Sequence, residues 1–157
     1  MGLNVSRILI AAVFTLMQGC ELFGERCEEF RFDDVETFDE EAKISVYAGF
    51  TKANDFVGRE RFKITSDGEC IIRNRELHTS MGRWHGNEDA ISVNVPQIRS
   101  GHADKADYLI KMTVAHELLH AGGAQHHNKD GILNPVMSYT DFTENDRKEC
   151  VRVGLCD

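Results

Sequence analysis

The chain has 157 residues, of which 41% are hydrophobic and 28% are charged, and its formal net charge is −8. These proportions are typical of a globular protein and exclude collagen-like and disordered classes, and the length suits one domain with a single core. The negative charge, without a stripe of Lys and Arg to neutralise phosphates, argues against nucleic acid as a partner.

The first twenty residues differ in character from the rest of the chain. One positive charge, Arg7, precedes an apolar run over 8–17 that is too short to span a bilayer comfortably, and Gly19 and Cys20 follow it. This arrangement resembles a bacterial lipoprotein signal, which implies that residues 1–19 are removed and that Cys20 carries a lipid. A plain secretory signal is the alternative. Both readings predict export; the first predicts a lipid anchor in the bacterial cell envelope, at the outer membrane in a Gram-negative cell.

The cysteine count agrees with export. The chain has five cysteines, and with Cys20 assigned to the lipid an even number is left. Disulfides form in oxidising compartments outside the cytoplasm. We therefore expect two disulfides among four residues: Cys27, Cys70, Cys150 and Cys156. Four cysteines allow three connectivities, and the sequence does not choose among them.

The chain after the signal begins with short elements. Weak alternation over 28–32 predicts a first strand. The acidic stretch 33–43 has two apolar residues at helical spacing, which predicts a short helix. The stretch 43–50 is rich in β-branched and aromatic residues and ends at a glycine, which predicts a second strand.

The middle of the chain continues the strand pattern. Two apolar arms around a turn at 66–68 predict a β-hairpin over 61–77. The polar, glycine-containing stretch 78–89 is expected to be a loop. Alternating apolar residues over 90–96 predict a further strand that stops at Pro96.

The second half of the chain has helical periodicity. From Asp104, apolar residues and histidines recur at steps of three and four, which predicts a helix that ends at Gly122 and Gly123. Thr143, with Asp146 three residues later, predicts the start of a final helix. Strands followed by helices predict an α+β fold with about five strands in a single domain over 20–157.

The chemistry is concentrated in HELLHAGGAQHH, residues 116–127. His116 and His120 lie one helical turn apart, so both imidazoles can reach one metal ion, with Glu117 beside it as a base. A chain reversal at Gly123 returns His126 as the third ligand. Three protein ligands leave the fourth position of a zinc ion open, as in catalytic sites. The motif therefore predicts a catalytic Zn²⁺ site.

The other histidines fit the metal site less well. His127 is the alternative third ligand, but the spacing through Gly123 favours His126. Three further histidines lack ligand spacing and are expected to be solvated: His78, His85 and His102.

The extended motif, together with a later NPVMSY segment over 134–139, resembles the metzincin clan of zinc endopeptidases. The resemblance covers roughly residues 104–152. It implies a mixed twisted sheet packed on an active-site helix, a methionine turn with Met137 beneath the metal, and a C-terminal helix. Tyr139, two residues after Met137, is similar to the tyrosine of the astacin and serralysin branches, which binds zinc or stabilises the oxyanion. The final helix is closer to matrixin-like sequences, so the branch stays open.

The resemblance implies a zinc-dependent endopeptidase that acts on a protein or peptide substrate, as a monomer. Glu117 would take a proton from zinc-bound water, and Tyr139 would assist the oxyanion. The substrate would lie extended along an edge strand, for which 70–74 is the candidate. The alternative is a non-catalytic, zinc-containing exported lipoprotein that binds or scaffolds. Glu117 favours the enzyme, because a structural site has no use for an unliganded carboxylate.

Overall fold

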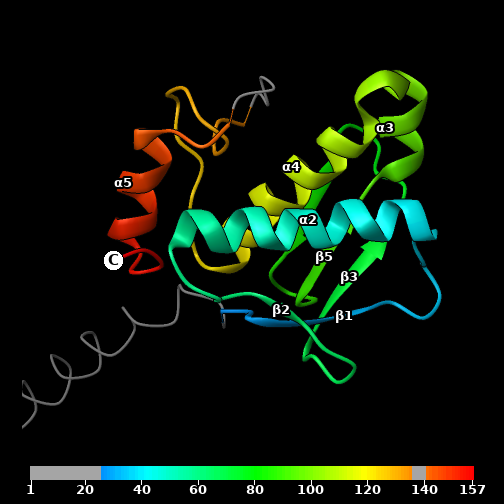
Figure 1. Ribbon diagram of the computed structural model, residues 1–157, viewed down its shortest axis with the longest axis horizontal. Helices are drawn as coiled ribbons and strands as arrows, with labels where there is room; N and C mark the ends of the chain where they lie inside the picture. The colour runs from blue at the N-terminus through cyan, green and yellow to red at the C-terminus, as the bar shows by residue number, and fades with distance from the viewer. Residues whose placement is uncertain (1–25, 136–140) are drawn as a thin grey trace, which may run out of the picture.

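A computed structural model of the protein describes residues 26–135 and 141–157. Within these ranges five strands and four α-helices form an α+β fold with one mixed sheet, which confirms the predicted class. Helices α2 (Glu40–Val57) and α4 (Ala106–Ala121) pack against each other and cover one face of the sheet (Figure 1). None of the helices described has the length and apolar character needed to cross a membrane.

The sheet has the strand order β2-β1-β3-β5-β4, and only the β4–β5 pair is antiparallel. The strands are β1 (Glu29–Phe32), β2 (Lys63–Ile64), β3 (Cys70–Asn74), β4 (Gly82–His85) and β5 (Ala90–Val93). Side chains alternate between the two faces of each strand, so Phe30, Ile72 and Ile91 share the face that the helices cover. All three are fully buried and form the centre of the core.

Two predictions about the strands were wrong because pairing in this sheet is long-range. The hairpin over 61–77 does not form, since β1 lies between β2 and β3. A Cβ at Gly68 would overlap the backbone of Phe30, so the connecting turn passes close to β1 and needs a glycine there. The segment 78–89 is not only a loop, because it contains β4.

The predicted edge strand was also wrong. Strand β3, which contains residues 70–74, is internal, between β1 and β5. The edges of the sheet are β2 and β4. Of these, β4 is the edge that contacts helix α4.

The N-terminal helix corrects two further predictions. The stretch 43–50, predicted as a strand, belongs to the 18-residue helix α2. Asp39 caps this helix by accepting from the N–H of Ala42, and apolar residues then recur at helical spacing and face the core. The stretch 33–39 is not helical, because the Asp33 side chain accepts from the N–H groups of Val35 and Glu36 and forms a turn there.

The later helices follow the predictions more closely. Helix α4 begins after a short 3₁₀ turn over Ala103–Lys105 and ends at Gly122, and α5 covers Glu144–Arg152 after Thr143. The strand predicted over 90–96 ends at Val93. Asn94 then caps helix α3 (Val95–Gly101), which the sequence did not predict.

Two disulfides form, as predicted: Cys27–Cys70 and Cys150–Cys156. The first links the chain before β1 to the start of β3. The second closes a short loop after α5, which places Leu155 against Gly122 at the end of α4. Disulfides are consistent with an oxidising, exported environment.

Candidate metal centre

Helix α4 carries His116, Glu117 and His120 in its last two turns. His116 and Glu117 are only 5% and 6% exposed, since this part of α4 packs beneath β4. The close packing requires a glycine in the strand: a Cβ at Gly82 would clash with Thr113 and lie 3.0 Å from Oε1 of Glu117. The sheet edge therefore lies directly over the predicted site.

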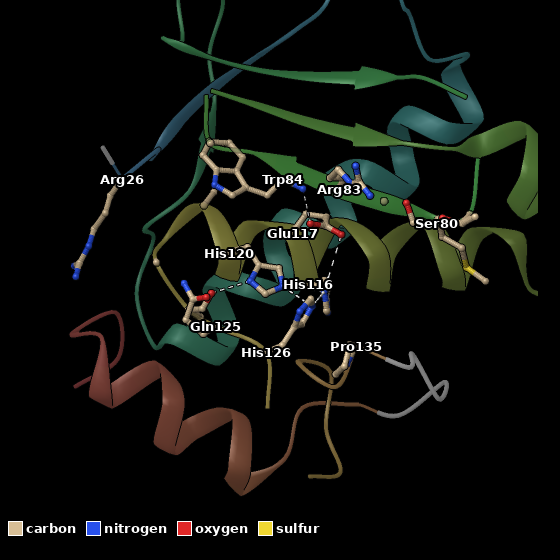
Figure 2. A pocket seen from close by; sticks show the side chains of 17 residues that line it. Arg26, Ser80, Arg83, Trp84, His116, Glu117, His120, Gln125, His126 and Pro135 are labelled. Carbon is tan, nitrogen blue, oxygen red and sulfur yellow. Dashed lines mark hydrogen bonds and ion pairs between the residues drawn. The ribbon is translucent and has the colours of Figure 1, made fainter. Parts of the chain in front are cut away.

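The three predicted ligands converge on one point, as Figure 2 shows. Nε2 of His120 lies 3.0 Å from Nε2 of His116 and 3.0 Å from Nε2 of His126, and the third separation is 3.2 Å. The structure thus brings together residues from α4 and from the segment that follows it. Exposure increases from buried His116 to exposed His126, so one side of the triad opens to solvent.

Hydrogen bonds fix which nitrogens face the centre of the triad. Nδ1 of His116 lies 2.5 Å from the carbonyl oxygen of Ile132, and Nδ1 of His120 lies 2.7 Å from that of Ala124. A carbonyl only accepts, so each Nδ1 carries the proton and each Nε2 presents a lone pair. Such an outer hydrogen bond is the usual way that a protein orients a metal-binding histidine.

This donor set fits a zinc ion. Nε2 of His116 and Nε2 of His120 both present lone pairs at a separation of 3.0 Å, an arrangement that a shared cation makes favourable. Nitrogens about 2.05 Å from one tetrahedral ion are separated by about 3.3 Å, close to the distances in the triad. The group could therefore hold a metal ion, and the identity of that ion remains a prediction.

The electrostatic environment keeps the ligands in the form that binds metal. Burial, and then the nearby His120, lowers the pKa of His116 to about 3, and burial lowers the pKa of His120 to about 4. Burial also lowers the pKa of His126. All three imidazoles are neutral near pH 7, so a metal ion does not have to displace their protons.

Glu117 lies beside the triad without joining it. Its Oε2 accepts a hydrogen bond of 2.7 Å from the main-chain N–H of Trp84, and its Oε1 lies 4.0 Å from Nε2 of His116. Burial raises the pKa of Glu117 to about 8, against the smaller lowering effects of the Trp84 N–H and the charge of Arg83. One carboxylate oxygen is therefore anchored, and the other faces the metal ligands.

The triad and Glu117 lie in a cleft of about 710 Å³. Its walls come from β4 on one side and from α4 and residues 123–126 on the other, with Arg26 and Pro135 also contributing (Figure 2). A cleft of this size suits part of a peptide or a small molecule.

The glycines that end α4 have different roles. Gly123 has φ +99°, a conformation that glycine adopts most readily, and the chain turns there between His120 and His126. Gly122 has an ordinary φ of −79°. A side chain there would come within 2.8 Å of Leu155, so close packing explains this glycine.

The remaining predicted residues are placed as follows. His127 does not join the triad, since its Nε2 lies 3.0 Å from Oδ1 of Asp146. His85 is partly buried rather than solvated, and burial lowers its pKa. Three predicted residues lie outside the described ranges: Cys20, Met137 and Tyr139.

Sequence reasoning missed several contributors to the site. They include the Trp84 N–H, the carbonyls of Ala124 and Ile132, and the buried carboxylate of Asp146, which was predicted only as a helix cap. A main-chain group leaves no signature in a sequence, and the capping pattern gave no sign that Asp146 also bonds the backbone of Ile132 and Leu133. No protein-family model and no curated protein matches the chain.

Proposed function

We propose that this protein is a zinc-dependent endopeptidase of the metzincin type, with Glu117 as its general base. The observation that carries the proposal is the position of Glu117: a buried carboxylate that stays outside the triad while one of its oxygens faces it. A zinc ion bound by the triad would polarise a substrate carbonyl and make a bound water more acidic.

The chain's own residues supply the proton transfers. The charge of a bound zinc ion would favour the ionised form of Glu117, which would take a proton from the attacking water through Oε1 while the Trp84 N–H holds Oε2. The same carboxyl would then pass that proton to the leaving amine as the peptide bond breaks. Tyr139 is proposed to donate to the developing oxyanion, and Met137 to lie beneath the metal.

The substrate is proposed to bind as an extended peptide along β4. This strand pairs with β5 on one side only, among the described residues. The N–H of Asn94 donates to the carbonyl of Met81, so in the antiparallel ladder the alternate residues Gly82 and Trp84 turn their main-chain groups away from β5. The Trp84 N–H is already bonded to Glu117, which leaves the two carbonyls and the Gly82 N–H for a peptide.

We also propose that the chain is exported and anchored through a lipid on Cys20, acting as a monomer. The two disulfides support export. Arg26, which lines the cleft, is six residues from Cys20, a span of at most about 22 Å. An anchored enzyme would therefore act close to the membrane surface. Mass spectrometry of the exported chain tests this part, since an N-terminus other than a lipidated Cys20 would contradict it.

Digestion of an unbiased peptide library by the zinc-loaded protein tests the activity. We expect cleavage that a chelator abolishes and that added zinc restores. A protein that binds zinc but cleaves no peptide would instead support the alternative, an exported zinc protein that binds or scaffolds.

A further inference from the structure

The loop of residues 123–133, here called the ligand loop, carries His126 and the two carbonyls that orient the other ligands. The carbonyl of Ala124 accepts from His120, and that of Ile132 accepts from His116. The geometry of all three imidazoles therefore depends on the backbone of this loop. Helix α5 lies against the loop, at the end of the molecule away from α3 (Figure 1).

The first contact from α5 holds the N-terminal part of the ligand loop. Oε1 of Glu149 accepts a hydrogen bond of 2.7 Å from the N–H of Gln125, the residue before His126. Arg152 holds the same carboxylate through two hydrogen bonds of 2.7 Å, and this contact lowers the pKa of Glu149. Glu149 is therefore ionised and oriented, as a strong acceptor for a main-chain N–H should be.

The second contact holds the C-terminal part of the ligand loop. Asp146 is fully buried, and it accepts from the N–H groups of Ile132 and Leu133 at 3.1 and 2.9 Å. Nε2 of His127 lies 3.0 Å from the same carboxylate. A Cβ at Gly131 would overlap Asp146, so this close approach of the loop to the carboxylate requires a glycine at position 131.

Helix capping alone does not account for these contacts. Asp146 also accepts from the N–H and the hydroxyl of Thr143, which completes the capping box of α5. A capping residue needs only those bonds and usually stays near the surface. Three further donors from the ligand loop converge on Asp146 instead, and the backbone of one of them, Ile132, orients His116.

We propose that Asp146 and Glu149 are positioning residues for the metal: together they hold both ends of the ligand loop and so set how tightly the triad binds its ion. This inference rests on the zinc site of the proposed function, though not on peptidase activity. Glu149 acts on His126 through Gln125, and Asp146 acts on His116 through Ile132. Loss of an outer-shell partner typically weakens metal binding by about 10- to 100-fold.

The test measures the zinc dissociation constant of the full chain by competition with a chelating dye. Glu149→Ala removes the acceptor for the Gln125 N–H, whereas Glu149→Gln keeps a carbonyl oxygen there. Asp146→Asn turns an NH₂ group toward donors that now meet a carboxylate. Glu144→Gln, at an exposed position in the first turn of α5, is the control for loss of one negative charge from the helix.

We expect Glu149→Ala and Asp146→Asn to raise the dissociation constant by about 10- to 100-fold. Glu149→Gln and Glu144→Gln should stay within about 3-fold of wild type, a range well below an outer-shell effect. The visible absorption bands of the cobalt-substituted protein should shift in Asp146→Asn, because the His116 ring changes its orientation. If Asp146→Asn does not fold, Glu149→Ala decides the question.

The proposal would be overturned if folded Glu149→Ala kept the zinc affinity of wild type. It would also be overturned if Glu149→Gln and Glu144→Gln lost as much zinc affinity as Glu149→Ala. Reduced stability of the metal-free variants with unchanged zinc affinity would overturn it too, because that result would indicate a purely structural role. A wild type that binds zinc but cleaves no peptide would overturn only the proposed activity. A wild type that binds no zinc would overturn both.

Discussion

The main-chain N–H of Trp84, on the edge strand β4, donates a hydrogen bond of 2.7 Å to Oε2 of Glu117, on helix α4. This bond connects the strand proposed to hold the substrate with the carboxylate proposed to act as base. It also leaves Glu117 with one oxygen toward the metal ligands in a buried setting.

Glu117 should make the stability of the metal-free protein depend on pH. Burial raises its pKa from 4.5 to about 8, so between these values the folded state binds more protons than the unfolded state. The contribution of Glu117 to the free energy of unfolding is thus fully present below pH 4.5 and is lost as the pH rises through 8. Glu117→Gln stays neutral, so we expect it to be more stable than wild type at pH 8.5, by about 5 kcal/mol, and similar to it at pH 4.

Denaturant unfolding in the presence of a chelator, from pH 4 to 8.5, measures this difference. The histidines titrate in both proteins, so their contributions cancel. Parallel stability curves for wild type and Glu117→Gln would contradict the raised pKa.

Gly82→Ala tests the close packing of β4 on α4. The added Cβ would clash with Thr113 and approach Oε1 of Glu117 to 3.0 Å, so the strand must move away from the helix. Overpacking of this kind typically costs about 1–3 kcal/mol. We expect a lower free energy of unfolding and weaker peptide cleavage with little change in zinc affinity. Gly86→Ala, in the turn after β4 where a Cβ comes no closer than 3.4 Å to Trp84, is the control, and equal effects of the two changes would refute this account.

Replacement of the adjacent histidines should separate a ligand from a supporting residue. His126→Ala removes a nitrogen from the triad, so we expect its zinc dissociation constant to rise by more than the about 10- to 100-fold that is typical of an outer-shell change. His127→Ala removes only a partner of Asp146 and should fall within that range. A larger loss in His127→Ala, measured by dye competition, would move the third ligand by one residue.

The two disulfides should differ in their contribution to stability. Cys27–Cys70 joins residues 43 apart in the sequence, and Cys150–Cys156 joins residues 6 apart. Loop-closure entropy then predicts about 4 kcal/mol for the first and about 2 kcal/mol for the second. Denaturant unfolding of the paired Cys→Ala variants measures both, and a larger loss for the short loop would show that packing of Leu155 outweighs chain entropy.

The parts of the fold that were predicted correctly are those that depend on local sequence. Helix α4 has its period and its terminal glycines within one continuous stretch, and α5 has its cap at Thr143. The wrong predictions depend on distant partners. The β-branched residues of 43–50 favour a strand locally, but burial of one face of α2 against the sheet and α4 outweighs that preference. Likewise, nothing in 61–77 indicates that β1 lies between its two strands.

The same distinction holds for the metal centre. His116, His120 and His126 could be predicted because one helix and one turn bring them together within eleven residues. The groups that support the site come from elsewhere: a main-chain N–H on β4 holds Glu117, and carboxylates on α5 hold the loop that carries His126. Their positions follow from tertiary packing, which a spacing motif does not encode.

The most direct test of the account is the turnover of a cleavable peptide by wild type and by Glu117→Ala at matched zinc content. General-base catalysis typically contributes about 10²- to 10⁴-fold to the rate. We expect wild type to cleave the peptide and Glu117→Ala to bind zinc with similar affinity, remain folded and lose cleavage by about that factor. Equal cleavage by both proteins would contradict the role of Glu117, and no cleavage by wild type of any peptide in the library would contradict the proposed function itself.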